Sequence, residues 1–492
     1  MTNNLIFFLP FIPLLSLPIY IATRSNKLHH GANLLVNGIV LAISLYLTKE
    51  ILSVHTLTNP RFHTYLDPLN TLLLLITAFL NFLISIYAVN YLNADVKHEK
   101  ITKPRIRIYY IMTNIFTFTM LLALTSGNFG IMWIAIEATT LASAFLVGFY
   151  NKRSSIEAAW KYIMICSVGI ATAFLGVILL HLSSIDCLNS EQYLYLPALI
   201  DNATAFDTGT LRLAFVFVLI GFGTKAGLAP MHSWLPGAHS QSPSPISALL
   251  SGVLLNTALY PIIRVMSLLN TNAASSRYTT PFLLTLAILS IVAAFYFILS
   301  QREYKSMLAY SSIEHMGIIT LALAVNTPLA IYGALLHLLN HSLTKTMLFL
   351  TTGNILHIYQ SGEIKSIKGL IRTAPFTGWV FILGLLAIAG TPPFSVFGSE
   401  FTILTAIFQK GSFLLGVILA VVLAGIFASI IYTVSPMLYG EAADKSAVTP
   451  FKTTSGNGVI LLLLVLIVIM GFNTPQALAE LISLAEQTIL PY

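Results

Sequence analysis

Long apolar runs follow one another along the whole chain and are separated by short polar segments. Most runs reach about 18 residues, the length that an α-helix needs to cross the hydrocarbon core of a bilayer. The pattern therefore predicts an all-α polytopic membrane protein with about fourteen transmembrane spans. The expected spans lie near residues 3–22, 31–53, 64–92, 108–125, 128–149, 156–183, 211–235, 244–268, 281–300, 306–325, 329–358, 376–407, 412–439 and 456–473.

Composition agrees with this pattern, because the chain is 56% hydrophobic and only 9% charged. Soluble domains carry about 25% charged residues. The longest connections between spans are about 30 residues, which is too short for an independent soluble core. The first span is not followed by a small-residue cleavage site, so we expect a permanent helix and not a signal peptide.

The basic residues are distributed unevenly between the two faces of the predicted bundle. Sixteen of the 25 lysines and arginines lie in odd-numbered loops, and six lie on the opposite face. The positive-inside rule then places the odd-numbered loops in the cytoplasm, and both termini and segment 184–210 outside. The net charge of +7 thus reflects membrane topology, and we expect no nucleic-acid partner. The first group is Arg24, Lys27, Lys97, Lys100, Lys103, Arg105, Arg107, Lys152, Arg153, Arg302, Lys305, Lys365, Lys368, Arg372, Lys445 and Lys452, and the second is Lys49, Arg61, Arg212, Arg264, Arg277 and Lys410.

The three remaining lysines, Lys161, Lys225 and Lys345, lie inside predicted spans. Lys225 stands near the middle of the apolar run 211–235, and Pro230 follows in the same run. A charge at mid-bilayer costs roughly 2.5–3.5 kcal/mol on insertion scales, so it needs a partner or a function. A proline inside the helix frees backbone groups that lipid cannot satisfy. Together these features predict a broken helix with an ion-handling site inside the membrane.

A second span has the same combination of a break and a single charge. Span 12 is interrupted at residues 390–393, of sequence GTPP, and it carries Glu400. Broken helices at matching positions in two halves indicate an inverted repeat, here spans 4–8 and 9–13. We therefore expect one transmembrane domain over residues 1–492. Its parts are N-terminal helices in 1–107, repeats in 108–268 and 281–439, and a C-terminal helix and tail in 440–492, where 475–492 is either an amphipathic surface helix or a frayed terminus.

Glu137 is the one charge in the otherwise apolar span 5. Two interpretations remain open for it. The carboxylate is either bonded to a neighbouring hydroxyl, that of Thr139 or Thr140, or it is the counter-charge of Lys225. An ion pair between Glu137 and Lys225 would offset the cost of burying both charges, and making and breaking it would change the proton affinity of the lysine.

Span 11 places His337, His341 and Lys345 at four-residue intervals, so they form one stripe on a helix. Histidine titrates near neutral pH and can pass protons, which favours a proton relay. Core histidines bonded to neighbouring hydroxyls are the alternative. The HxxxH spacing is also compatible with a metal ion, but no nearby carboxylate or cysteine in the sequence completes such a site, and we expect none.

Span 10 adds Glu314 and His315, which are adjacent and therefore face different neighbours. Their depth suits either proton entry from the cytoplasmic side or structural hydrogen bonds. His232 and His239 follow the break in span 7, and Asn256 lies in span 8. All three are candidates for contact with water in the membrane interior.

Charges at the start of span 6 have a simpler interpretation. Ser154 and Glu157 have the spacing of a capping box, which predicts a helix N-terminus there. Lys161 follows Glu157 by four residues and would pair with it on the helix surface. Lys161 then either extends toward the water interface or modulates the Glu137–Lys225 pair.

Cofactor chemistry is not expected in this chain. Its two cysteines, Cys166 and Cys187, form no CxxC or CxxCH motif, so iron–sulfur, zinc and c-type haem sites are not predicted. The sequence also has no P-loop and no GxGxxG opening a helix after a strand. Any redox cofactors or nucleotides would belong to partner chains.

The sequence resembles the antiporter-like membrane subunits of respiratory complex I, Mrp cation/proton antiporters and membrane-bound hydrogenases. The resemblance covers nearly the whole chain and rests on GFGTKAGLAPMHSWLPGAHSQSPSPISALLSGVLLNTALY, AYSSIEHMG, LLNHSLTK and TPPFSVFGSEF. The runs IEATTLASAFLVGFY and IEAAWKYIMICSVGI are most similar to the F component of hydrogenase-4 and formate hydrogenlyase-type complexes.

This resemblance implies a proton path through the membrane centre. It makes Glu137 and Lys225 the coupled pair and Glu400 the terminal ionisable group of span 12. Several family members have a connecting lysine where this chain has Asn256, which leaves a gap that water or Lys345 would have to bridge. We expect proton translocation to involve Glu137, Lys225, His315, His337, His341, Lys345 and Glu400, with secondary roles for Lys161, His232, Asn256 and Glu314.

The function that the resemblance implies is proton pumping in a multi-subunit redox complex. Partner membrane subunits and peripheral redox subunits would supply the electron transfer, and the complex would lie in a prokaryotic inner membrane. A sodium/proton antiporter subunit of an Mrp-type complex is one alternative. A membrane subunit that energises a soluble partner is another, and a scaffold that pumps nothing is the last.

Overall fold

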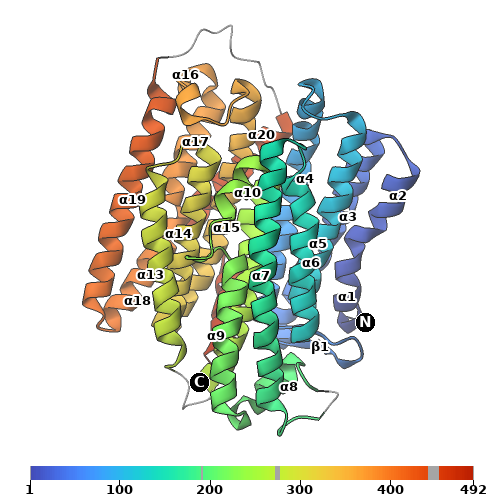
Figure 1. The fold of residues 1–492 in the computed structure, drawn as a ribbon, viewed down its shortest axis with the longest axis vertical. Helices are drawn as coiled ribbons and strands as arrows, with labels where there is room; N and C mark the ends of the chain where they lie inside the picture. Colours follow the sequence, from blue (N-terminus) through green and yellow to red (C-terminus); the bar gives the residue numbers. More distant parts are fainter. Residues whose placement is uncertain (1, 190–191, 272–276, 442–453, 491–492) are drawn as a thin grey trace.

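The apolar runs fold into a bundle of long, roughly parallel helices (Figure 1). A computed structural model of the chain describes residues 2–189, 192–271, 277–441 and 454–490. Its helices are α1 (Thr2–Phe8), α2 (Leu17–Ala22), α3 (Asn26–Val54), α4 (Pro68–Lys97), α5 (Lys103–Thr125), α6 (Phe129–Val147), α7 (Arg153–Ser184), α8 (Leu196–Asn202), α9 (Thr208–Lys225), α10 (Leu235–Gln241), α11 (Ser244–Leu249), α12 (Leu255–Thr271), α13 (Thr279–Ile298), α14 (Tyr304–Val325), α15 (Pro328–Tyr359), α16 (Leu370–Thr373), α17 (Pro375–Ile388), α18 (Ser395–Gln409), α19 (Phe413–Tyr439), α20 (Thr454–Phe472) and α21 (Gln476–Ile489).

Short elements complete the bundle. The strands β1 (Leu57–Asn59) and β2 (Thr64–Leu66) pair antiparallel in the loop before α4. A 3-10 segment, Leu9–Ser16, joins α1 to α2, and a π-helical turn, Leu250–Leu254, joins α11 to α12. Further 3-10 turns lie at Pro60–Phe62, Ala203–Ala205 and Ile364–Ser366.

The predicted spans all coincide with helical segments, but fewer pass a test of length and hydropathy. Among the described residues, eleven helices are long and apolar enough to cross a membrane, and α20 with α21 makes a twelfth if that bent pair is one span. The difference from the predicted fourteen has a physical reason. α15 is long but carries many polar side chains, and span 12 is divided into the shorter helices α17 and α18.

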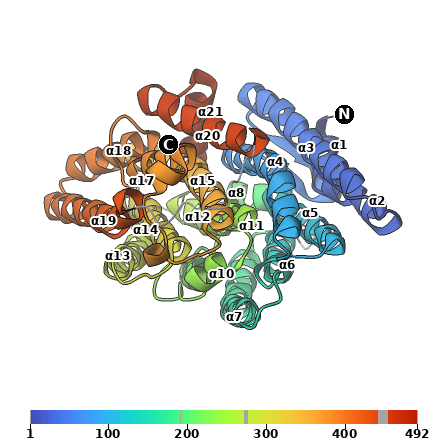
Figure 2. The same ribbon diagram turned by 90° about the horizontal axis from the view of Figure 1, so that it is seen from above.

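The polar helices lie in the middle of the bundle. Figure 2 shows α12, α14 and α15 surrounded by other helices, with α1 to α3 at one edge and α19 at the opposite edge. The most apolar stretch of Ser244–Thr271 is 100% buried, and that of Tyr304–Val325 is 94% buried. The outer helix α19 is only 28% buried in the same measure. Helices that expose side chains to lipid therefore enclose those that carry titratable groups.

The two predicted breaks are confirmed. α9 ends at Lys225 and α10 begins at Leu235, while α17 ends at Ile388 and α18 begins at Ser395. Each break packs beside an unbroken helix, α9 against α7 and α18 against α15. This matching relation between spans 6 and 7 and spans 11 and 12 agrees with the expected repeat.

Side chains satisfy the backbone groups that the breaks release. The indole Nε1 of Trp234 donates to the Thr224 carbonyl at 2.9 Å, and the Ala229 N–H donates to Ser290 Oγ at 2.9 Å. At the second break, the Asn340 amide donates to the Ser395 carbonyl at 2.7 Å. Because lipid offers no hydrogen bonds, these contacts allow irregular backbone at membrane depth.

Two predictions about helix ends can be compared with the structure. The capping box expected at Ser154 and Glu157 is wrong: α7 begins at Arg153, and the Ser155 hydroxyl accepts the Lys152 N–H at 2.9 Å. The Ser154 hydroxyl instead donates to Gln241 and so links the start of α7 to α10.

Of the two alternatives for residues 475–492, the helix is correct. α21 turns by 71° from the preceding helix and buries four apolar side chains, Leu481, Ile482, Ala485 and Ile489.

Both chain ends lie in the lower half of Figure 1, toward α8, which agrees with an even number of crossings. The basic odd-numbered loops lie toward the other end, with α16. Of the charges assigned to loops, Glu191, Lys445 and Lys452 fall outside the described residues.

A buried ion pair fixes the start of α4 to α12. Arg264, which the sequence analysis counted among the cations of the opposite face, is fully buried and donates to Asp67 Oδ1 at 2.5 Å. Asp67 also caps α4 by accepting two backbone N–H groups. The Arg264 guanidinium lies 4.9 Å from the ring centre of Tyr260 and 5.8 Å from that of Tyr65. Removing the carboxylate would therefore leave a buried, uncompensated charge.

We predict that Asp67→Ala lowers the free energy of unfolding by about 3–5 kcal/mol, because Arg264 loses its only ionic partner among the described residues. Asp207 is the matched control, since it caps α9 through Thr210 N–H at 2.7 Å but is exposed and pairs with no described cation. Asp207→Ala should cost only about 1 kcal/mol. Thermal unfolding of the two detergent-solubilised variants measures these losses. Equal losses of the free energy of unfolding would contradict this account.

Candidate proton-transfer site

Lys225 is the last residue of α9 and is completely buried. Its ammonium donates to Thr140 Oγ1 at 2.7 Å and to the Tyr162 hydroxyl at 2.5 Å. Nζ also lies 4.7 Å from the centre of the Tyr162 ring. The break in the helix contributes as well, because the carboxyl end of a helix carries partial negative charge that favours a cation. The ammonium is therefore stabilised by neutral oxygens, a ring face and a helix end.

Glu137 is bonded to the hydroxyl of Thr140, one of the two arrangements predicted for it, and it forms no direct ion pair with Lys225 in the described part of the chain. Its Oε1 accepts from Ser167 at 2.8 Å, and its Oε2 accepts from Thr140 at 3.3 Å. The two ion pairs in the described part of the chain lie elsewhere. The reason is helical spacing: Thr140 lies one turn from Glu137 on α6, on the side toward α9. The Thr140 hydroxyl thus donates to Glu137 and accepts from Lys225, which makes it a bridge between the two charges.

Two of the secondary residues lie away from this bridge. Lys161 is exposed on α7, which agrees with a side chain that extends toward the interface. His232 is half-buried in the break after α9, and its ring lies 6.1 Å from Tyr310 and 6.4 Å from Phe297. Both contacts are on the side of α13 and α14, away from α6.

The stripe on α15 is confirmed as a buried face directed at α14. His337, His341 and Lys345 are all fully buried. His337 Nε2 lies 2.9 Å from His315 Nδ1, and its other nitrogen lies 2.9 Å from Ser399 Oγ. Lys345 donates to the Leu308 carbonyl at 2.8 Å. A hydrogen-bonded line therefore runs from α14 through α15 to α18.

Glu314 and His315 serve different neighbours, as expected for adjacent residues on a helix. His315 meets His337, and its ring centre lies 5.3 Å from that of His341. Glu314 is also buried, and its Oε2 has no hydrogen-bond partner among the described protein groups. Of the two neighbours on α14, His315 is therefore the one that contacts the α15 stripe by a hydrogen bond.

The α15 stripe continues past Lys345 toward the first half of the chain. The next residue on the same face, Phe349, stacks on His239 of α10 with ring centres 4.7 Å apart. Neither ring nitrogen of His239 or His341 has a hydrogen-bond partner among the described protein groups. Asn256 donates to Ser342 of α15 at 2.7 Å.

Glu400 lies in the second turn of α18 and is 7% exposed. It lines a cavity of about 280 Å³ between the span 12 break and α19. Its carboxylate comes close to Gly390, whose φ of +66° turns the chain at the break. A side-chain carbon at position 390 would overlap the carboxylate. The break therefore fixes the position of Glu400 by steric contact.

A carboxylate does lie near the histidines, and the prediction that none would is wrong. Glu400, His315 and His337 each offer a ligand atom, and these atoms lie within 4.8 Å of one another. The fold causes this, because α18 returns beside α15 after the break. The His315–His337 hydrogen bond would have to open before both nitrogens could bind one metal ion, so the closed arrangement is better suited to passing a proton.

Sequence reasoning missed a second buried cluster near the end of the bundle that carries the basic loops. Asp95 of α4 accepts from His357 of α15 at 2.9 Å and from the Tyr150 hydroxyl at 2.7 Å. Tyr150 in turn lies 2.8 Å from the Tyr91 hydroxyl. Lys305, assigned to a loop, is also buried and donates to the Ser242 carbonyl at 2.6 Å. These residues stand at span ends, where the sequence gives no signal of burial.

Comparison with known proteins identifies the family. A model of the NADH:quinone oxidoreductase/Mrp antiporter transmembrane family matches residues 126–428, which contain both breaks and all the charges described above between Glu137 and Glu400. The chain belongs to this family.

Individual relatives agree with the family match. The hydrogenase-4 component F homolog of Methylacidiphilum infernorum is 38% identical, over 77% of this chain and 80% of the relative. A Na(+)/H(+) antiporter subunit of Alkalihalophilus pseudofirmus is 27% identical, over 75% of this chain and 73% of the relative. In the Mrp complex of Dietzia sp. DQ12-45-1b, one chain superposes with a TM-score of 0.87 at 19% identity, over 100% of this chain and 98% of that chain. This chain is therefore a multi-pass membrane protein of the antiporter-like fold.

We predict that Gly390→Ala lowers the free energy of unfolding by about 1–3 kcal/mol more than Gly411→Ala does, because it overpacks the Glu400 carboxylate. Gly411 is a matched control, since it also has a positive φ, of +80°, but open space around it. When each glycine substitution is made separately in a Glu400→Ala background, the two should lower the free energy of unfolding equally. Denaturant titrations of the detergent-solubilised variants measure this difference, and an excess that persists without Glu400 would refute the steric contact.

Proposed function

We propose that this chain translocates protons across the membrane as a subunit of a multi-subunit redox complex. The observation that carries the proposal is the row of buried titratable side chains across the two halves. Lys225, His315, His337, His341 and Lys345 are each fully buried, and Glu400 is nearly so. Burying so many ionisable groups is costly in a membrane protein, and such groups typically mark ion pathways.

In the first half, Glu137, Thr140 and Lys225 form the exchange unit. The hydroxyl of Thr140 contacts both charges, at 3.3 Å from Glu137 and 2.7 Å from Lys225. A shift of the lysine toward or away from Glu137 changes the stability of its charged form, because the nearby opposite charge favours protonation. Moving one charge against 100 mV costs about 2.3 kcal/mol, a swing that one buried ion pair can supply.

In the second half, protons would pass along the α15 stripe to Glu400. His337 contacts both His315 and Ser399, and Ser399 is the residue before Glu400 on α18. The unpartnered nitrogens of His239 and His341 lie between this line and the first half, and ordered water typically satisfies such buried groups. Water rather than a lysine would then cover the gap at Asn256.

The redox part of the proposal rests on the relatives. The hydrogenase-4 component F homolog shares 38% identity, and the chain has no cysteine motif for an electron carrier of its own. We infer that partner membrane subunits and peripheral redox subunits complete the complex in a prokaryotic inner membrane. Electron transfer there would drive protons from the basic face toward the face that holds α8 and the termini.

Lys225→Ala should reduce proton translocation by the native complex to the leak of empty vesicles, because the mobile charge of the first half is gone. Lys161→Ala is the matched control, because Lys161 is an exposed lysine on a neighbouring helix. The complex with this variant should translocate protons at the wild-type rate. The measurement is vesicle acidification followed with a pH-sensitive dye, after reconstitution of the purified complex. Blue-native gels check that both variants assemble. Wild-type pumping by an assembled Lys225→Ala complex would sink the proposal.

A sodium/proton antiporter subunit is the second candidate, because the 27% identical relative is part of such an antiporter. Purification from the native host, with mass spectrometry of the co-purifying chains, separates the two candidates. A hydrogenase, formate dehydrogenase or quinone-module protein would support redox-driven pumping. Small membrane subunits alone, together with proton movement that requires sodium, would favour the antiporter.

A further inference from the structure

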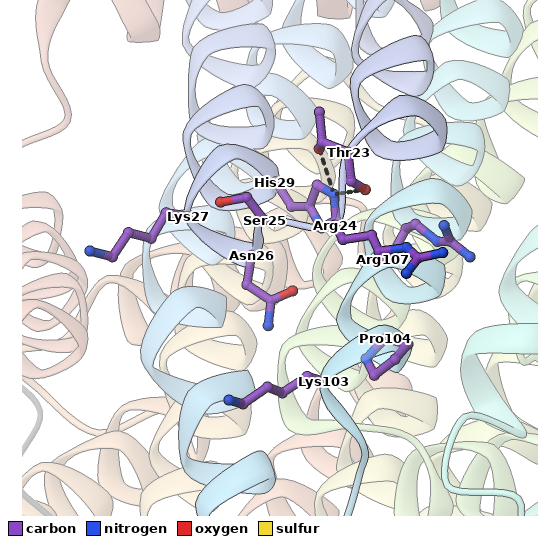
Figure 3. Close-up of a pocket in the computed structure, with 9 residues that line it drawn as sticks. All are labelled: Thr23, Arg24, Ser25, Asn26, Lys27, His29, Lys103, Pro104 and Arg107. Atoms are coloured by element: carbon purple, nitrogen blue, oxygen red, sulfur yellow. Dashed lines mark hydrogen bonds between the residues drawn. The ribbon is translucent and has the colours of Figure 1, made fainter.

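A basic pocket lies at the edge of the bundle, far from the proton-transfer residues in sequence. It has a volume of about 650 Å³ and is formed where α2 ends and α3 and α5 begin. The lining residues are Thr23, Arg24, Ser25, Asn26, Lys27, His29, Lys103, Pro104 and Arg107 (Figure 3). The pocket belongs to the end of the bundle that carries the basic loops.

The charge of the pocket is strongly one-sided. Its nine lining residues include four cations and no carboxylate. In Figure 3, Arg24 and Arg107 extend in one direction and Lys27 and Lys103 in the other, with Asn26 between them. None of the four cations forms an ion pair in the described part of the chain. The four positive charges therefore stand around one opening without internal neutralisation.

The backbone adds to this positive field. α3 begins at Asn26 and α5 begins at Lys103, so two long helices start at the pocket. Their N-cap residues, Ser25 and Thr102, make no side-chain capping hydrogen bond. Free N–H groups and the positive end of the helix dipole favour an anion at such a position.

His29 supplies a polar side chain inside the pocket wall. It is only 2% exposed, and its Nε2 lies 3.1 Å from both the hydroxyl and the carbonyl of Thr23. Its Nδ1 has no hydrogen-bond partner among the described groups. The contacts of His29 with Thr23 hold the end of α2 against the start of α3, so they fix the basic turn that carries Arg24 and Lys27.

Exposed apolar side chains flank the basic turn that joins α2 to α3. Ile21 is 72% exposed on α2, and Leu28 is 53% exposed on α3. A ligand that combines an anionic head with hydrocarbon chains would satisfy both surfaces at once, whereas a free inorganic anion would use only the first.

We propose that this pocket binds the phosphate headgroup of an anionic phospholipid, with Arg24 and Arg107 on the phosphate and the acyl chains along Ile21 and Leu28. Arginine suits this role because its planar guanidinium donates two parallel hydrogen bonds to phosphate oxygens. Basic pockets between helices at the cytoplasmic side of a membrane commonly hold such headgroups. The site is independent of proton translocation.

The test is lipid titration of the full chain, purified in mild detergent and followed by native mass spectrometry. Phosphatidylglycerol is the probe, and phosphatidylcholine is the comparison without net charge. The wild type should retain phosphatidylglycerol in preference to phosphatidylcholine. Arg24→Gln/Arg107→Gln should weaken that binding roughly thirtyfold, since each basic residue near an anionic surface contributes about a factor of five.

Two variants keep the test specific. Lys97→Gln/Arg153→Gln removes two exposed cations from the same face but outside the pocket, and should bind as the wild type does. Lys27→Gln/Lys103→Gln repeats the test with exposed side chains, should the arginine variant fail to fold, and should also weaken binding.

Three outcomes would overturn the proposal. In the first, a folded pocket variant binds phosphatidylglycerol as tightly as the control variant. In the second, phosphatidylcholine is retained equally by the wild type. In the third, inorganic phosphate displaces the bound lipid completely, which would make this a site for free anions.

Discussion

A charge inside the hydrocarbon core has no water to stabilise it, and the protein must supply every contact that water would make. The ammonium of Lys225 obtains these contacts from two hydroxyls, one aromatic face and the end of a broken helix. The break is therefore part of the solvation of this charge. It also creates a second need, because the broken backbone itself requires partners. Trp234 and Ser290 meet that need. The Trp234 ring lies 4.7 Å from that of Tyr162, so the side chains that support the break pack against those that hold the charge.

The two halves use related architecture for different chemistry. In the first half a cation sits just before the break, at the end of α9, whereas in the second half an acid sits after the break, in α18. α15 joins them as a continuous helix of 32 residues. Its buried face presents a histidine and a lysine to α14, an asparagine to α18, and a serine to Asn256 of α12. An unbroken helix at the centre keeps these groups in fixed register while the neighbouring broken helices provide the irregular backbone.

Much of this arrangement could be predicted from the sequence. The apolar runs predicted the helices, Pro230 and residues 390–393 predicted the breaks, and the four-residue spacing of His337, His341 and Lys345 predicted one buried face. These signals are local, so a single chain reveals them. The meeting of Glu400 with His315 and His337 could not be predicted, because it depends on how α18 packs against α15.

Residues at span ends were the hardest to interpret for the same reason. Arg264, Lys305 and Asp95 lie near the ends of predicted spans, where the sequence suggests contact with water, but all three are buried. The sequence also could not decide which side chain of α6 contacts Lys225. The sequence correctly brought α6 and α9 together, but one helical turn decides that Thr140, and not Glu137, contacts the lysine.

The hydroxyl of Thr140 has a consequence for the timing of transport. It holds one hydrogen, which points at Glu137, while its lone pair faces Lys225. A proton handed from the lysine through this oxygen to the carboxylate leaves the hydroxyl with its hydrogen on the side of Lys225. The C–O bond must then rotate before a second proton can follow in the same direction. In the proposed exchange unit, this single rotor between two charges would pass one proton per turn and reset between turns, which would oppose continuous leakage through the first half of the membrane domain.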